Sequence, residues 1–574
     1  MTSPIGRDDL RRRHPSTLGR LAGSCALLIA SVTAAECARA DDFDAALASP
    51  LAAEREQAVD RVIETRDASP ELLASLAVLL DDADLHVAGK AAKALALRGA
   101  RAFDTIDGLL RNGSAQQRRG ATIALYQTNA DIARFLPALT RQLSQDDPLL
   151  VRASLSALSR LGPGAAPALP ALKGTLAHDD TEIRWATLQV LATIGPAGRD
   201  LVPDVLPYLR DEAPELRLAA AAAVRSMEPP APITAERLGV YIDWLREHVP
   251  RLMEEYHVPG ISIAIVQRGQ VHWTQGFGVA DANDATPVSV DTIFEACSMS
   301  KPILALSALQ LVQDGRLDLD IPLTAYLGHD YLPDQPEHRR ITARMALTHR
   351  TGLANWRMGY DDLGGPLPLL FAPGSEYSYS GEGILFLQRA MEAISGKPIE
   401  RLAQEGLFAP LGLTHTSFVW TDDVEEELAS GHREDGSFKE RSHYRKANGA
   451  YSLYTTPSEY ARLMLTLMDP SKLGDHAFTR ASIDLMLQRH LRVADEDAVL
   501  RPGLAHSVAT YRALGFSLEV TAEGDIVQHS GSNSTGFKVF GQLNPAKGSG
   551  LVIFSNGDNG SRVREAIVAE VGDL

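Results

Sequence analysis

An internal repeat in the first 230 residues restricts the fold more than any other feature of this chain. Four arginines mark it at intervals of about 33 residues: Arg118, Arg152, Arg184 and Arg217. Each unit predicts two short amphipathic helices separated by a Gly/Pro turn. One helix pair cannot bury its apolar stripe alone, so neighbouring pairs must stack. The sequence therefore predicts an all-α array of stacked helix pairs from about residue 45 to residue 228.

A second register of the repeat gives the same spacing. Leu161-Gly162-Pro163 matches Ile194-Gly195-Pro196 in the next unit. The pattern resembles the short HEAT-type repeats, and five or six copies cover nearly all of residues 45–228. The resemblance implies a curved helical solenoid that binds proteins or other partners. A role as a rigid spacer, or as a cap on the following domain, is equally compatible with this pattern, because solenoid architecture does not by itself identify a ligand.

The first 40 residues predict an export signal. Residues 11–13 and Arg20 give a positively charged start, and residues 21–35 are mostly apolar but too few to span a bilayer. Ala38-Arg39-Ala40 then matches the small-x-small pattern of a cleavage site. A short buried helix is the alternative. We therefore expect cleavage after Ala40, a periplasmic or secreted mature protein, and no transmembrane segment.

Net charge and cysteine content limit the partners and the disulfides that we expect for this chain. The net charge of −17 argues against a nucleic-acid partner, which would favour a basic surface. Cys25 and Cys37 leave with the predicted signal, so Cys297 has no partner for a disulfide within the chain. Cysteine packs as a small apolar residue, so we interpret Cys297 as buried, with a reactive thiol as the alternative.

A second domain is predicted from residue 229 to residue 574. The proline cluster at 229–232 cannot continue a helix, and Thr234 then caps a long amphipathic helix that extends to about Tyr256. Residues 260–266 and 271–278 predict a strand pair joined by a turn, and residues 537–543 and 550–555 predict two more strands near the other end. Helical segments lie between. This order predicts an α+β domain, with an antiparallel sheet built from both ends of the segment and helices packed against it.

The segment Ser298-Met299-Ser300-Lys301 opens an apolar helical run and carries the candidate chemistry. Residues three apart lie on one face of a helix, so Ser298 and Lys301 can touch. A serine hydroxyl is a poor nucleophile unless a base lies nearby, and apolar surroundings favour the neutral amine that could serve as that base. Ser300 is the rival nucleophile, but it faces elsewhere on a helix. The alternative for Lys301 is a surface salt bridge.

Several further motifs follow in order along the chain. They are Gly315-Arg316-Leu317-Asp318, Leu347-Thr348-His349-Arg350-Thr351-Gly352-Leu353, Tyr379-Ser380, Pro410-Leu411-Gly412-Leu413 and His529-Ser530-Gly531-Ser532. Together with Ser298-Met299-Ser300-Lys301 they resemble the β-lactamase-related serine hydrolases over about residues 236–560. That group includes class C β-lactamases, penicillin-binding proteins, D-aminopeptidases and esterases. The resemblance implies a β-lactamase/transpeptidase-like α/β sandwich and an acyl-enzyme mechanism.

The resemblance also implies roles for individual residues. Tyr379 matches the proton-shuttling tyrosine of the family's Y-x-N motif, although Gly381 stands where many members have asparagine. His529 and Gly531 match H-x-G, the third motif of esterase-like members, where others have K-T-G. His529 is expected to bind substrate, to tune Tyr379 or only to pack. The N–H groups of Ser298 and Ser532 are expected to form the oxyanion hole, and Gly531 to let a ligand approach the backbone.

The expected function is an exported serine hydrolase without a cofactor. No His/Cys/Asp cluster in the sequence has zinc spacing, and no glycine loop is typical of phosphate binding. Because Gly381 and His529 depart from the penicillin-recognising pattern, an ester substrate is favoured over a D-amino-acid peptide or a β-lactam. The alternative is a repeat-based binding or regulatory protein with a weakly active or inactive hydrolase-fold domain. Residue 349 is expected to hold a loop.

Overall fold

The computed structural model describes residues 45–574 except 66, 284, 358–366 and 494–500. The predicted export signal at 1–40 therefore lies outside the described residues. The chain divides into two compact units, one ending at Ile194 and one beginning at Gly195. The sequence-based division between residues 228 and 229 stays a prediction.

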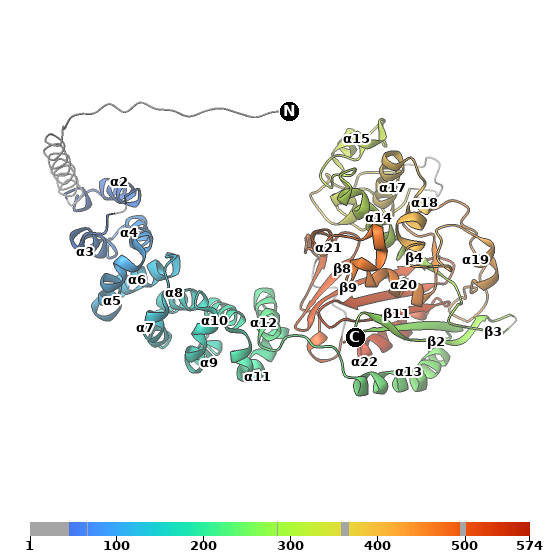
Figure 1. Cartoon of the computed structure of the whole chain (residues 1–574), viewed down its shortest axis with the longest axis horizontal. Coiled ribbons are helices and arrows are strands. Elements are labelled where there is room, and N and C mark those ends of the chain that lie inside the picture. The colour runs from blue at the N-terminus through green and yellow to red at the C-terminus, as the bar shows by residue number, and fades with distance from the viewer. Residues whose placement is uncertain (1–44, 66, 284, 358–366, 494–500) are drawn as a thin grey trace, which may run out of the picture. The chain divides into compact units, whose positions relative to one another are not determined.

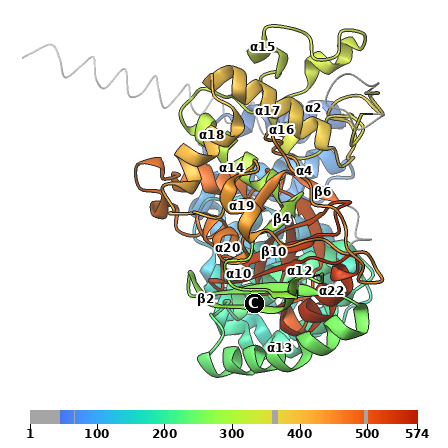
Figure 2. The same ribbon diagram turned by 90° about the vertical axis from the view of Figure 1, so that its right-hand side faces the viewer.

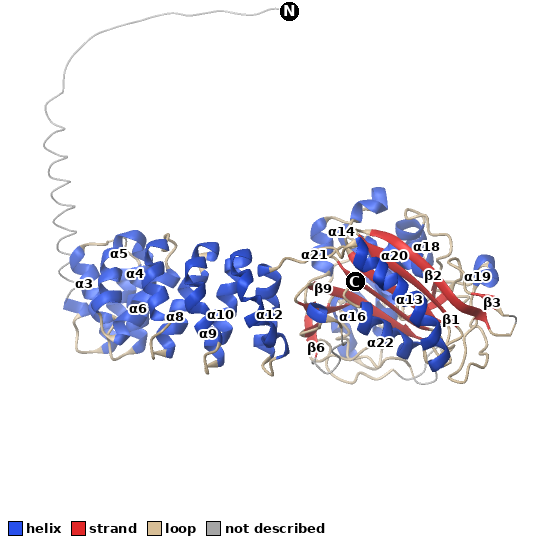
Figure 3. Cartoon of the chain, turned by 90° about the horizontal axis from the view of Figure 1, so that it is seen from below, coloured by secondary structure: helices blue, strands red, loops and turns tan. Residues whose placement is uncertain are grey.

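The first unit is helical and its helices stack in a regular order (Figures 1 and 3). Helix α4 contacts α2 and α6, and α8 contacts α6 and α10. Helices α6, α8 and α10 begin at residues 115, 148 and 181, so each begins 33 residues after the last, as the repeat predicts. The HEAT-type assignment of this helical region stays a prediction. The helices are α2 (Ala52–Ile63), α3 (Pro70–Leu79), α4 (Leu85–Arg98), α5 (Phe103–Asn112), α6 (Ala115–Gln127), α7 (Leu136–Gln142), α8 (Pro148–Ser159), α9 (Leu169–Leu176) and α10 (Thr181–Ile194).

The second unit begins with three helices, α11 (Val202–Val205), α12 (Pro214–Met227) and α13 (Ala235–Tyr256). Helix α13 begins as predicted, because the Thr234 hydroxyl accepts a hydrogen bond from the N–H of Arg237 at 3.2 Å. Its apolar stripe, including Leu238 and Leu245, is buried. Among the described residues, no helix combines the length and apolar composition needed to cross a bilayer.

A nine-stranded antiparallel sheet forms the centre of this unit, in the order β3-β2-β1-β11-β10-β9-β8-β7-β6. Strands β1 and β11 pair directly, with Ile263 opposite Ile553, so the sheet is assembled from both ends of the segment as predicted. The strands are β1 (Gly260–Gln267), β2 (Gln270–Asp281), β3 (Thr286–Pro287), β6 (Leu491–Val493), β7 (Ala509–Arg512), β8 (Ser517–Thr521), β9 (Gly524–Ser532), β10 (Lys538–Asn544) and β11 (Ser549–Ser555). A separate pair joins β4 (Phe294–Cys297) to β5 (Leu453–Thr455).

Helices cover both faces of the sheet (Figure 2). Each face has its own apolar core. Side chains alternate along a strand, so Ile263 and Ile265 of β1 face α13 and α22 (Gly560–Val571), whereas Ala264 and Val266 face the opposite core. That opposite core contains α14 (Ser300–Gln313), which is buried nearly all round. The other helices of this unit are α15 (Thr324–Leu327), α16 (Ala343–Leu347), α17 (Gly381–Ser395), α18 (Ile399–Ala403), α19 (Asp422–Glu427), α20 (Pro457–Leu465) and α21 (Arg480–Met486).

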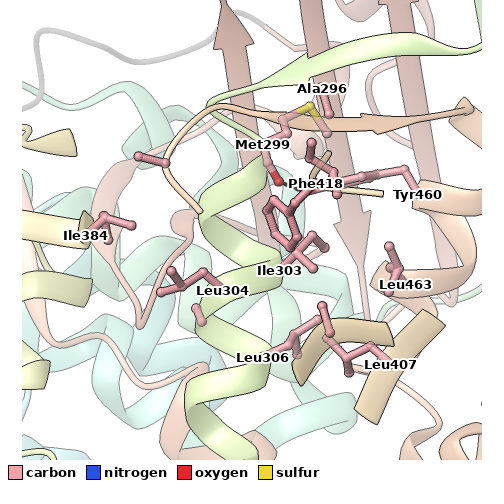
Figure 4. Close-up of a cluster of buried hydrophobic side chains, with 14 of the residues drawn as sticks. Ala296, Met299, Ile303, Leu304, Leu306, Ile384, Leu407, Phe418, Tyr460 and Leu463 are labelled. Carbon is pink, nitrogen blue, oxygen red and sulfur yellow. Dashed lines mark hydrogen bonds between the residues drawn. The ribbon is translucent and has the colours of Figure 1, made fainter. Parts of the chain in front are cut away.

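The close-up in Figure 4 shows why α14 is fixed in place. Ile303, Leu304 and Leu306 lie among side chains from other segments, including Leu407 and Phe418. Interiors packed at this density resist displacement, because any shift opens voids or forces overlap. The helix that carries Lys301 is therefore a rigid element of the core.

Leu306→Ala should lower the free energy of unfolding by about 2–5 kcal/mol, because it removes a large side chain from a site that is only 1% exposed. Val240→Ala, at a 61% exposed position of α13, is the matched control and should change it by less than about 0.5 kcal/mol. Urea unfolding of the two variants measures the difference. Equal effects would contradict the packing described for α14.

Candidate active site

Ser298 lies in the tight turn between β4 and α14. We predicted Ser298 within the helix, and this was wrong by two residues, because α14 begins at Ser300. The N–H of Lys301 still donates to the carbonyl of Ser298 at 3.1 Å, so the turn brings the two residues together. Cys297, just before the serine, has a φ of +50°, a strained conformation that surrounding packing must hold. The strained turn leaves Ser298 at the wall of a cavity.

The amine of Lys301 lies beside Ser298, and the lysine side chain is fully buried. Its Nζ lies 3.1 Å from Ser298 Oγ and 2.7 Å from the carbonyl oxygen of Ala450. It also lies 4.7 Å from the centre of the Tyr379 ring. Within the described part of the chain, no carboxylate lies within 4.0 Å of this amine. The structure thus brings together Ser298, Lys301 and Tyr379, three residues that the sequence predicted to act together.

His349 holds the segment that carries Tyr379. Its ring centre lies 4.3 Å from that of Tyr379, and its carbonyl accepts the N–H of Ser378 at 3.0 Å. Its Nδ1 accepts the N–H of Ser380 at 3.2 Å. Burial, followed by the charges of Arg512 and Lys301, lowers the pKa of His349 far below its usual range, so the ring stays neutral and keeps this acceptor. The loop that His349 was expected to hold is therefore the one before α17, which positions Tyr379.

His529 lies on β9 at the cavity wall and is neutral. Its Nδ1 lies 2.7 Å from the carbonyl oxygen of Ser530, which can only accept, so the proton is on Nδ1 and Nε2 is an acceptor. Burial, followed by the charges of Lys301 and Arg512, lowers the pKa of His529 to about 3. The third motif of this chain therefore supplies a hydrogen-bond acceptor, where a lysine would supply a positive charge.

Gly531 also has a packing role that the sequence did not indicate. A Cβ at this position would lie 2.8 Å from both the carbonyl oxygen of Ala296 and the Cβ of Cys297. The glycine therefore lets β9 pack against the turn that carries Ser298, and its expected role in letting a ligand approach the backbone stays a prediction. Ser532 follows it, opposite Lys538 in the β9–β10 ladder, and its Oγ accepts from Lys538 Nζ at 2.8 Å.

Ser298, Tyr379, His529, Gly531 and Ser532 all line one cavity of about 1150 Å³. The roles assigned to these residues stay predictions. No motif marks the further residues that line the cavity, and of these only Tyr377 was considered individually from the sequence, as a packed aromatic: Asn355, Trp356, Arg357, Tyr377, Glu382, Tyr444, Tyr451 and Arg512. They come from segments that only the folded chain brings together. In the described ranges, no group of three or more His, Cys, Asp or Glu residues could hold a metal ion.

Glu295 is a second feature that the sequence did not reveal. This fully buried carboxylate on β4 accepts hydrogen bonds at Oε2 from Asn533 Nδ2 and Thr535 Oγ1, both at 2.8 Å, and from Tyr444 OH at 3.1 Å. Burial raises the pKa of Glu295, while these donors oppose the rise. The carboxyl group thus ties the strand before Ser298 to the segment after Ser532 and to a tyrosine of the cavity wall.

Ser300 and Cys297 have structural environments. The Ser300 hydroxyl donates to the carbonyl of Cys297 at 2.6 Å and accepts the N–H of Leu453 at 3.0 Å, and the residue is fully buried. The Cys297 side chain is also fully buried, as predicted, and burial raises the pKa of its thiol. Neither residue lines the cavity, which leaves the half-buried Ser298 as the nucleophile candidate of this segment that reaches the cavity.

The neutral state of His529 predicts a pH dependence of stability. Its pKa is about 3 when folded and about 6.5 when unfolded, so the unfolded chain binds more protons between these values and stability falls as pH falls. His529→Gln should remove this contribution. Between pH 7 and pH 5 the wild-type protein should lose about 1–2 kcal/mol more than the variant, measured by urea unfolding. Parallel pH profiles would contradict the assignment.

Gly531→Ala tests the contact between β9 and the nucleophile turn. The added methyl group must displace backbone at Ala296, so we expect at least about tenfold slower labelling of Ser298 by an active-site serine probe, together with lower stability. Gly174→Ala is the control, because a Cβ there meets nothing within 4 Å. Labelling at the wild-type rate in Gly531→Ala would show that the contact is unimportant.

Comparison with known proteins agrees with this geometry. The family model described as Beta-lactamase matches residues 245–572, more than half of the chain. The chain is 24% identical over 334 residues to protein flp of Staphylococcus aureus strain N315, which covers 55% of this chain and 62% of that protein. It is 30% identical over 193 residues to esterase EstB of Burkholderia gladioli, covering 29% of this chain and 49% of that one.

Two further proteins are similar to this chain. Unguisins hydrolase ungD of Aspergillus violaceofuscus is 25% identical over 257 residues, covering 40% of this chain and 45% of that protein. The octameric penicillin-binding protein homologue from Pyrococcus abyssi has a TM-score of 0.49 at 21% identity, covering 58% of this chain and 77% of that one. The chain thus spans about half to three-fifths of the length of these curated relatives. The family match, the antiparallel sheet between helical layers and the paired Ser298 and Lys301 together show that the chain belongs to the beta-lactamase family.

Proposed function

We propose that this chain is an exported serine hydrolase that acts through an acyl-enzyme. One observation carries the proposal: Ser298 Oγ lies at the cavity wall, 3.1 Å from the buried amine of Lys301. A hydroxyl beside an amine, with a tyrosine ring beside that amine, is the arrangement that activates a serine for attack on a carbonyl.

The residues act in a fixed order. Ser298 Oγ attacks the substrate carbonyl as Lys301 accepts its proton, and Tyr379 delivers a proton to the leaving group. The backbone N–H groups of Ser298 and Ser532 hold the oxyanion, at roughly 3 kcal/mol for each donor. Water then attacks the acyl-enzyme, the proton transfers run in reverse, and the free acid leaves.

An ester is the favoured substrate, ahead of a D-amino-acid peptide or a β-lactam. His529 is neutral, so the third motif does not place a cation where a lysine would attract a substrate carboxylate. Gly381 lacks the amide that would bind a substrate amide group. One curated relative is named an esterase and another a hydrolase of unguisins, which also supports hydrolysis of acyl compounds.

We further propose that the protein works in the periplasm or outside the cell. Its N-terminal helical region, which precedes the hydrolase domain, acts in partner binding or spacing. The arginine-rich, apolar first 40 residues support export, and the 33-residue helix spacing supports a HEAT-type array. A solenoid presents a long surface for a partner, whereas a spacer would need only its stiffness.

Labelling with a fluorophosphonate tests the central claim. The wild-type protein should be labelled and Ser298→Ala should not, because the probe forms its bond at the nucleophile. Lys301→Met should slow both labelling and ester hydrolysis by about 10²–10⁴-fold, since it removes the general base. Ser300→Ala is the matched control for a neighbouring hydroxyl. Equal labelling of wild type and Ser298→Ala would overturn the proposal.

Substrate preference is measured on the same proteins. A nitrophenyl ester, a D-alanine peptide and a chromogenic cephalosporin should be turned over in that order of kcat/KM. Faster turnover of the cephalosporin would reverse the order proposed here without affecting the role of Ser298.

A further inference from the structure

The space beside Gly381 is occupied by an indole ring. A Cβ built on Gly381 would lie 2.3 to 2.7 Å from three carbon atoms of the Trp356 ring. No side chain fits there while the ring stays in place, because such distances lie far inside van der Waals contact. The missing asparagine of the second motif is therefore coupled to an aromatic ring that takes its space and lines the cavity.

The position of Trp356 is fixed by its neighbour. The N–H of Gly381 donates to Asn355 Oδ1 at 2.8 Å, and the N–H of Glu382 donates to the carbonyl of Asn355 at 3.0 Å. Two hydrogen bonds to the start of α17 thus hold the residue before the tryptophan. With Oδ1 accepting from Gly381, the NH₂ group of Asn355 remains as a donor at the cavity that this residue lines.

Trp356 is one end of a continuous aromatic wall. Its ring meets Tyr451 edge to face, with centres 5.4 Å apart, and Tyr451 meets Tyr444 in the same way at 5.3 Å. Tyr451 follows Ala450, whose carbonyl holds Lys301, and Tyr444 donates to Glu295. The wall is therefore anchored to the same groups that position the nucleophile.

Aromatic residues are concentrated in this cavity. Five of the 22 described residues that line it are aromatic, whereas aromatic residues make up 6% of the chain. Edge-to-face and offset contacts between rings are favourable beyond the burial of area, so such a wall selects for a planar ring over an aliphatic group of similar size.

We propose that Trp356, Tyr451 and Tyr444 form a subsite for an aromatic ring of the substrate, with Asn355 as a hydrogen-bond donor at its edge. The inference rests on the proposed function and names its substrate class, aryl-bearing esters. The ring can belong to the acyl part or to the alcohol part of the ester, and the two arms of the experiment distinguish them.

The experiment uses the full chain and two matched ester pairs, with acid release measured by titration. A higher kcat/KM for methyl phenylacetate than for methyl cyclohexylacetate would place the ring on the acyl side of the ester. A higher kcat/KM for benzyl acetate than for cyclohexylmethyl acetate would place it on the alcohol side. The wild-type protein should prefer the aromatic member of one pair by about 2–13-fold in kcat/KM, the factor equivalent to about 0.5–1.5 kcal/mol.

Trp356→Leu should abolish that preference, with a kcat/KM ratio of about 1, because leucine keeps apolar volume but has no ring. Gly381→Ala should weaken the preference as well, since its methyl group must displace the indole. Trp244→Leu is the control: its ring stacks on His248 of α13, outside the cavity, and the preference should be unchanged.

Fluorophosphonate labelling counts the working sites in every variant, so a folding defect is not mistaken for a change of preference. No aromatic preference in the wild-type protein, or an unchanged preference in Trp356→Leu, would overturn the subsite while labelling at Ser298 still supports the hydrolase. Loss of labelling and of all ester turnover in the wild-type protein would instead overturn the proposed function.

Discussion

The arrangement of the site depends on the burial of one amine. Lys301 is fully enclosed, and its Nζ is held between Ser298 Oγ and the carbonyl of Ala450. Burying a polar group without partners is costly, so this amine restricts every element that touches it. The turn before α14, the segment around Ala450 and the ring of Tyr379 must all meet at one point, and the packed core around α14 keeps them there.

The surroundings of this amine differ from the penicillin-recognising pattern at two positions. His529 gives a neutral acceptor, because burial and then the charges of Lys301 and Arg512 lower its pKa. At Gly381 the ring of Trp356 takes the space that a side chain would need, and this ring lines the cavity. These two features support the proposed preference for uncharged, ring-bearing esters, and neither is part of the contact between Ser298 and Lys301.

The sequence alone was sufficient for much of this organisation. Helical periodicity and cap chemistry are local properties, so the helix that starts after Thr234 and the 33-residue spacing of the helix pairs could be predicted directly. The sheet built from both ends followed from the order of strands and helices. The start of α14 was missed by two residues, because Ser298 lies in a turn after Cys297, whose positive φ is held by the surrounding packing.

The pairing of Ser298 with Lys301 was determined by the sequence, because three residues of spacing in a turn or helix fix the contact locally. The carbonyl of Ala450 that holds the Lys301 amine, and the rings of Trp356 and Tyr451 that line the cavity with Ser298, were brought there only by the tertiary structure. These segments lie up to about 150 residues apart, and a backbone carbonyl or a wall tyrosine carries no motif. Gly531 shows the same limit, since its close approach to the turn before Ser298 cannot be read from residue type.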